Sequence, residues 1–172
     1  MARVHAGQAT VGPMLYGAVG GVAAGLFGLV VMTAAEVLGG GGGFQTSNLI
    51  GAWFVRWLQV ADTDALTGFY ADATLGGMAV GAVGGAVVGA LVAGLLARHP
   101  EARMMAWGVV SGLLAWAIVW YLVAPVLSPV LVRVLDWRVA AASGMAYGLM
   151  LGWWMRFGRF SARSIDARLT RP

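Results

Sequence analysis

Glycines recur every four residues within four long apolar segments, and this spacing constrains the fold more than any other feature of the sequence. They are Gly17, Gly21 and Gly25 in the first segment, Gly77, Gly81, Gly85 and Gly89 in the second, Gly108 and Gly112 in the third, and Gly144, Gly148 and Gly152 in the fourth. Residues four apart share a helix face. A face without side chains lets two helix backbones approach closely, as in membrane proteins with GxxxG motifs. The spacing therefore predicts close helix packing, within one chain or between chains.

The composition places this bundle in a membrane. The chain has 172 residues, of which 60% are hydrophobic and 10% charged, and its mean hydropathy is +0.81. A soluble domain carries roughly a quarter charged residues, so this chain lacks the polar surface that water requires. We therefore expect a single all-α, polytopic transmembrane domain over residues 1–172. The absence of cysteine excludes disulfides and thiolate metal sites.

The arginines predict the topology. The predicted spans are residues 13–38, 73–97, 104–124 and 139–155, which form a four-helix bundle. Eight arginines lie on the side of the two termini, and only Arg56, Arg133 and Arg138 lie on the other side. The positive-inside rule then places the N and C termini in the cytoplasm. The net charge of +4 comes from these flanking arginines, so we expect contact with membrane lipids and no nucleic-acid partner.

The connection between the first two spans predicts a helix on the outer face. A flexible linker, Gly39–Gly43, precedes residues 48–60, in which Ile50, Trp53, Phe54 and Trp57 recur at helical spacing. Asn48 and Arg56 fall on another face, and Thr46 or Ser47 is the expected N-cap. This pattern is typical of an interfacial amphipathic helix. Trp53, Trp57, Arg56 and Arg133 are the expected interfacial anchors.

The two halves of the chain resemble each other in order and motif. The aromatic and glycine pattern of residues 16–21 returns at 107–112, and that of 76–81 returns at 143–148. This repetition predicts a helical hairpin used twice. Pro125 and Pro129 are expected to end the third span and to begin a short re-entrant or surface segment, Val126–Asp136. The basic tail 156–172 is expected to anchor the chain on anionic lipid.

Glu36 is the one acid within a predicted span and is the candidate functional acid. Ionisable groups at membrane depth are costly unless they are paired or hydrated. Glu36 falls near the outer interface, where we expect it to be either solvated or paired with an arginine of that side, Arg56, Arg133 or Arg138. Ser111, Ser143 and Thr33 have no acid–base partner in the sequence pattern, and we expect hydrogen bonds to carbonyls instead. We therefore predict no catalytic residue, no metal site, no cofactor and no enzyme, although a bound lipid or quinone stays open.

Three short motifs carry a resemblance over about two-thirds of the chain. They are Val31-Met-Thr33, Gly112-Leu-Leu-Ala-Trp116 with Pro125 after it, and Tyr147-Gly-Leu-Met-Leu-Gly152. In these the chain resembles small uncharacterised four-helix membrane proteins of prokaryotes, some encoded near respiratory complexes. The resemblance implies a prokaryotic inner membrane and a bioenergetic setting. The expected function is a non-enzymatic accessory subunit beside other transmembrane subunits. The alternative is a self-associating channel or carrier for a small molecule.

Overall fold

The described part of the chain is helical throughout, as the sequence predicts. The computed structural model describes residues 4–40, 42–53, 66–96, 100 and 103–169, and these contain no strand. The elements are α1 (Val4–Leu38), α2 (Gln45–Gly51), α3 (Ala71–Leu96), α4 (Met104–Ile118), the π-helical turn η4 (Val119–Val123), α5 (Ala124–Leu127), α6 (Pro129–Val134) and α7 (Trp137–Leu169). The all-α class is confirmed.

Three of the described helical stretches are long and apolar enough to cross a membrane. They are Gly12–Leu38 within α1, Ala71–Leu96 as α3, and Met104–Val126 from α4 into α5. They coincide with the first three predicted spans, which supports a multi-pass membrane protein. The predicted fourth span, 139–155, lies within α7, which continues through the arginines of the tail to Leu169 and is not among the three.

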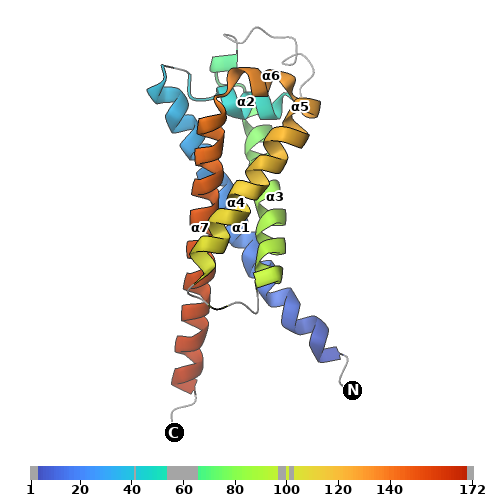
Figure 1. Ribbon diagram of the computed structural model, residues 1–172, viewed down its shortest axis with the longest axis vertical. Coiled ribbons are helices and arrows are strands. Elements are labelled where there is room, and N and C mark those ends of the chain that lie inside the picture. The colour runs from blue at the N-terminus through green and yellow to red at the C-terminus, as the bar shows by residue number, and fades with distance from the viewer. Residues whose placement is uncertain (1–3, 41, 54–65, 97–99, 101–102, 170–172) are drawn as a thin grey trace.

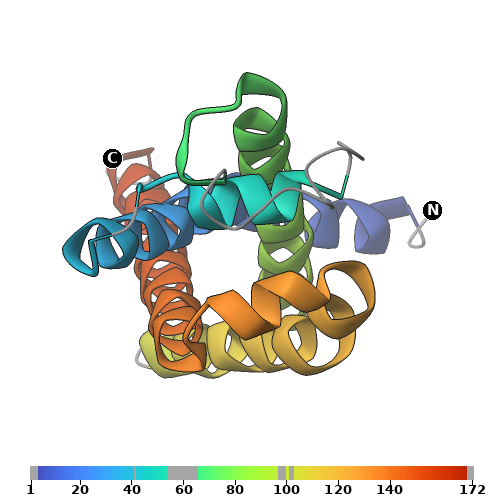
Figure 2. The same cartoon turned by 90° about the horizontal axis from the view of Figure 1, so that it is seen from above.

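The long helices run alternately up and down the molecule. Figure 1 shows α1 and α4 rising from the end where both termini lie, and α3 and α7 returning to it. The short helices α2 and α6 lie across the opposite end, which we call the capped end (Figure 2). The 27 residues from Gly12 to Leu38 span about 40 Å at ~1.5 Å per residue. Because this exceeds a hydrocarbon core of roughly 30 Å, the marked inclination of α1 across the bundle lets it fit.

Glycine faces join α1 to α3. A Cβ atom built at Gly21 would lie 3.1 Å from Gly89 Cα and would overlap the Gly85 carbonyl. A Cβ atom at Gly85 would lie 3.2 Å from Gly25 Cα, where ordinary van der Waals contact begins at 3.4 Å. The two backbones therefore touch directly, and a side chain at these positions would force them apart. Gly17 and Gly81 belong to the same interface.

A second glycine interface joins α4 to α7 in the same manner. Cβ atoms at Gly108 and Gly112 would each lie 2.8 Å from a Cα atom of α7, those of Gly152 and Gly148 respectively. Gly144 instead makes room for an aromatic residue, since its Cβ would lie 2.6 Å from that of Trp116. The predicted glycine faces are thus used within this chain, as two helix pairs.

Larger side chains hold the two pairs together. Tyr147 of α7 is buried, and its hydroxyl donates a hydrogen bond of 3.0 Å to the Gly85 carbonyl of α3. Tyr16 of α1 stacks on Trp154 of α7, with ring centroids 5.6 Å apart, and donates a hydrogen bond of 3.1 Å to the Trp154 carbonyl. Gly20 accommodates the same indole ring, because a Cβ there would lie 2.7 Å from Trp154 Cγ.

The third long helix ends between Pro125 and Pro129, as the sequence predicts, although it continues two residues past Pro125. The helix passes through η4 and α5 to Leu127, and it breaks at Ser128, whose φ and ψ are −149° and 80°. In η4 the Ala124 N–H bonds to the Val119 carbonyl, five residues back. A proline lacks this donor and its ring collides with the carbonyl four residues back in a regular helix. The wider π turn immediately before Pro125 relieves that conflict, and Pro129 then opens α6.

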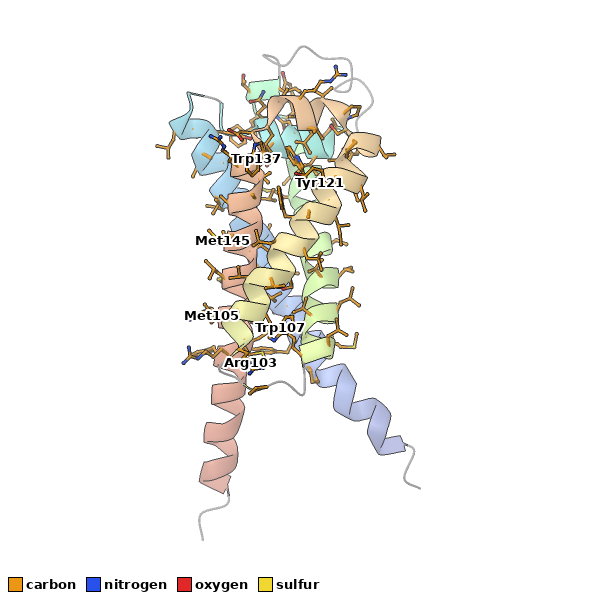
Figure 3. The ribbon with its side chains drawn as sticks, viewed as in Figure 1. Arg103, Met105, Trp107, Tyr121, Trp137 and Met145 are labelled. Carbon is orange, nitrogen blue, oxygen red and sulfur yellow. The ribbon has the colours of Figure 1, made fainter. Side chains whose placement is uncertain are left out.

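The outer surface is rich in large apolar side chains along its whole length. In each of the three candidate membrane spans, at most 28% of the most apolar 18-residue stretch is buried inside the protein. Figure 3 shows Arg103, Met105 and Trp107 toward the terminal end, Tyr121 and Trp137 toward the capped end, and Met145 between these levels. Membrane proteins commonly carry aromatic side chains at both membrane–water interfaces and apolar side chains between them. The distribution on this surface agrees with that pattern.

Candidate functional site

Polar contacts gather at the capped end, where α2 packs on α3. Asn48 is fully buried, and its Nδ2 donates hydrogen bonds of 2.7 Å to the carbonyls of Leu66 and Gly68. Its Oδ1 accepts a hydrogen bond of 2.7 Å from Thr74 Oγ1 of α3. Because every polar atom of this side chain is bonded, its burial is compatible with a stable cap. Asn48 therefore fixes α2 to α3 and to the segment before it.

The structure corrects the prediction of an interfacial helix over 48–60. The helix begins earlier, at Gln45, and Phe44 rather than Thr46 or Ser47 is its N-cap residue. Thr46, Ser47 and Asn48 of this helix are all buried, so the helix face that carries Asn48 is packed against the rest of the protein. The cause is a close approach to α3, since a Cβ at Gly51 would lie 2.7 Å from Ala73 Cα. Residues 54–60, with Arg56 and Trp57, lie outside the described residues.

Glu36 bonds to the first turn of α2 and not to a described arginine. Its Oε1 accepts hydrogen bonds from the backbone N–H of Thr46, at 2.7 Å, and from the Thr46 hydroxyl. Its Oε2 is buried and has no hydrogen-bond partner among the described residues. Of the three possible arginine partners, Arg133 and Arg138 do not pair with Glu36, and Arg56 lies outside the described residues. Both arginines are exposed, and the Arg138 guanidinium lies 5.7 Å from the centre of the Trp137 ring.

Glu36 lines a cavity of about 260 Å³ at the capped end. The cavity lies between the last turn of α1, the start of α2 and the junction of α6 with α7. Its described polar side chains are those of Glu36, Gln45, Thr46 and Asp136, and its apolar side chains include Leu49, Val134, Leu135 and Val139. Two carboxylates thus share one small and otherwise largely apolar site.

Asp136 reaches this cavity because it caps α7. Its Oδ1 accepts a hydrogen bond of 2.8 Å from the backbone N–H of Arg138, the second residue of α7. A carboxylate at this position satisfies a free helix N–H and interacts favourably with the positive end of the helix. Leu135, just before it, is extended, with φ −85° and ψ 129°. This short connection brings Asp136 to the site that Glu36 occupies from α1.

The remaining candidate residues scatter over the bundle. The glycines lie in the two helix interfaces, Gly77 lies under α2, and Arg133 is exposed at the end of α6. Trp53 is half-buried and its indole N–H is unpartnered among the described residues. Ser111 and Ser143 donate to the carbonyls of Gly108 and Ala140 in their own helices, which confirms the expected use of these hydroxyls. In the described part of the chain no three His, Cys, Asp or Glu residues are grouped to hold a metal ion.

Sequence reasoning missed the partners that build the site. The sequence pattern predicts Thr46 only as a helix cap and places Asp136 only within the short surface segment after Pro125. The available signal was the polarity of Asn48, Thr74 and Tyr147, each beside or within an apolar segment. Polar side chains in such places generally bond to one another or to backbone, because an unpaired polar group is costly there. That rule indicates buried hydrogen bonds but does not identify which partners meet.

Comparison with known proteins finds no protein-family model, no curated protein and no solved structure that matches this chain. The description of the protein therefore rests on its own sequence and geometry. These define a helical, multi-pass membrane protein with two glycine-joined helix pairs and a carboxylate-bearing cavity at one end.

Proposed function

We propose that this protein is a non-enzymatic accessory subunit of a larger membrane complex and that it crosses the membrane four times. In this proposal α7 is the fourth span, and both termini are cytoplasmic in a prokaryotic inner membrane. The support for a fourth span is the antiparallel packing of α7 on α4 through Gly108, Gly112 and Gly148. The support for the orientation is the excess of arginines at the end of the termini.

The main support for the proposed function is the distribution of side-chain sizes: glycines line the contacts between helices, and large apolar side chains are exposed on the outer surface. Membrane helices commonly associate through small residues. In this protein those glycines are buried in the interfaces between α1 and α3 and between α4 and α7. Tyr147, Tyr16 and Trp154 close the contact between the pairs. The apolar outer surface then contacts lipid, or fits helices of other subunits by van der Waals packing. The resemblance in the sequence motifs suggests a bioenergetic complex, respiratory or otherwise concerned with electron transfer.

Extraction from the native membrane tests the proposal. The membrane is solubilised in a mild detergent, and the assembly that contains this chain is isolated on a native gel and analysed by mass spectrometry. Migration in a large assembly with stoichiometric partner subunits is the expected result. Migration of the chain as a monomer or small homo-oligomer in several mild detergents would refute the accessory-subunit proposal.

The cavity at Glu36 favours a second candidate function, a channel or carrier for a small molecule. An acid at the edge of the membrane is a typical entry point for a cationic solute. Reconstituted vesicles would test it, with uptake of a labelled small cation compared between the wild type and Glu36→Gln. Uptake that depends on Glu36 would favour the carrier, whereas equal leakage from vesicles with and without the protein would exclude it for that solute.

A further inference from the structure

We propose that the cavity at the capped end binds a small organic cation, of the class of the short alkylammonium ions, between the carboxylates of Glu36 and Asp136. This inference concerns a ligand site and does not depend on whether the protein is an accessory subunit. It rests on an acceptor without a donor, on the charge of the lining, and on the size and apolar walls of the cavity.

Glu36 supplies the acceptor. Thr46 donates to one carboxylate oxygen only, and Oε2 is buried without a donor among the described residues. A carboxylate oxygen removed from solvent is costly when the group lacks a counter-charge and a full set of hydrogen bonds, as Glu36 does among the described residues. The terminal torsion of a glutamate side chain is soft, so the carboxylate can turn an oxygen toward a donor in the cavity. An ammonium group, with its charge and its N–H donors, supplies both of the missing interactions.

The charge of the lining selects a cation over an anion. Asp136 adds a second carboxylate, held in place by its bond to the Arg138 N–H. None of the described lining residues is basic. Arg138 lies over the Trp137 ring and is exposed, as is Arg133. An anion would meet two like charges in the lining, whereas a cation would meet two opposite ones.

The walls select an organic cation over a metal ion. Calcium requires six to eight oxygen ligands, and the described residues hold no group of three His, Cys, Asp or Glu residues. The aliphatic side chains of Leu49, Val134 and Val139 offer apolar contact to a short hydrocarbon chain instead. The volume of about 260 Å³ lies just below the roughly 300–1,000 Å³ of sites for drug-sized ligands, so the ligand is small.

Calorimetric titration of the full-length protein in nanodiscs tests the proposal. The probe is n-butylammonium chloride, and sodium chloride at the same concentration is the reference. We expect saturable binding of butylammonium to the wild type and an affinity at least about tenfold lower in Glu36→Gln, the loss typical of a hydrogen bond to a charged group. Asp136→Asn should weaken binding by a smaller factor. Asp72→Asn is the matched control, because Asp72 is an exposed carboxylate in the first turn of α3, at the same end but outside the cavity lining.

A second variant keeps the test decisive if Glu36→Gln alters the packing of α2. Val134 lines the cavity and is 38% exposed, so Val134→Phe should narrow the cavity without a cost to the core. It should weaken butylammonium binding more than methylammonium binding. Equal affinity in the wild type, Glu36→Gln and Val134→Phe would overturn the proposal, as would equal heats for sodium and butylammonium. Binding that appears only in Arg56→Gln would identify the Arg56 guanidinium as the occupant and would likewise overturn it.

Discussion

Alanine substitution of two adjacent glycines of α3, Gly84 and Gly85, should destabilise the protein at Gly85 but not at Gly84. A Cβ at Gly85 would lie 3.1 Å from the Gly21 carbonyl carbon and 3.2 Å from Gly25 Cα, whereas a Cβ at Gly84 meets nothing within 4 Å. Gly85→Ala must therefore push α1 and α3 apart along backbone atoms that cannot rotate away. It also displaces the Gly85 carbonyl, which accepts the hydrogen bond from Tyr147.

The magnitude follows from two opposing effects on the free energy of unfolding. Overpacking of a close contact costs about 1–3 kcal/mol, and replacing glycine by alanine within a helix recovers up to about 1 kcal/mol. We expect Gly85→Ala to be destabilised by about 1–2 kcal/mol, which is a factor of about 5–30 in the folded-to-unfolded ratio. Gly84→Ala gains only the higher helix propensity of alanine, so this variant should be as stable as the wild type or slightly more stable.

Unfolding by SDS titration from mild detergent micelles, followed by tryptophan fluorescence, measures both variants against the wild type. The chain contains eight tryptophans, and Trp154 lies in the contact between the two helix pairs, so the signal reports on packing. If Gly85→Ala is as stable as Gly84→Ala, the direct backbone contact between α1 and α3 is refuted.

Other substitutions test the remaining contacts by the same unfolding assay. Tyr147→Phe removes the hydrogen bond to the Gly85 carbonyl and should cost about 0.6–1.7 kcal/mol, the range for hydrogen bonds between membrane helices; unchanged stability would mean that this bond does not hold the helix pairs together. Asn48→Ala removes three hydrogen bonds. At about 1 kcal/mol for each bond, the free energy of unfolding should fall by about 3 kcal/mol. A fall below about 0.5 kcal/mol, roughly half of one bond, would contradict the buried position of Asn48. Thr46→Val keeps the backbone N–H donor to Glu36 and loses the hydroxyl donor, so its cost should be about 1 kcal/mol and should vanish in a Glu36→Leu background.

The helices and their packing faces could be predicted from the sequence because both depend on local pattern. Apolar length defines α1, α3 and α4, and the spacing of Gly21, Gly85 and their neighbours indicates which faces lack side chains. Which faces meet could not be read from that spacing, because glycines of any two helices are chemically alike. The pairing of α1 with α3 and of α4 with α7, each with the next long helix along the chain, is the arrangement that a helical hairpin used twice predicts.

The site could be predicted only in part. Glu36 stands out because an acid in an apolar segment is unusual. Its partner Thr46 does not stand out, since a threonine before an amphipathic segment also fits a helix cap. Asp136 reaches the cavity through the fold of α6 onto the start of α7, which follows a helix that continues past Pro125 through a π turn and breaks at Ser128. Such a turn has no clear local signature in the residues Val119–Val123.

Single-cysteine accessibility tests the central claim, that the chain crosses the membrane four times with its termini on one side. The chain has no cysteine, so Gly68→Cys at the capped end, Pro100→Cys between α3 and α4, and Ser164→Cys in the tail each report one position. In intact cells an impermeant thiol reagent should label Gly68→Cys only, and permeabilised cells should label all three. Labelling of Ser164→Cys together with Gly68→Cys in intact cells would show that α7 does not cross the membrane and would contradict the account.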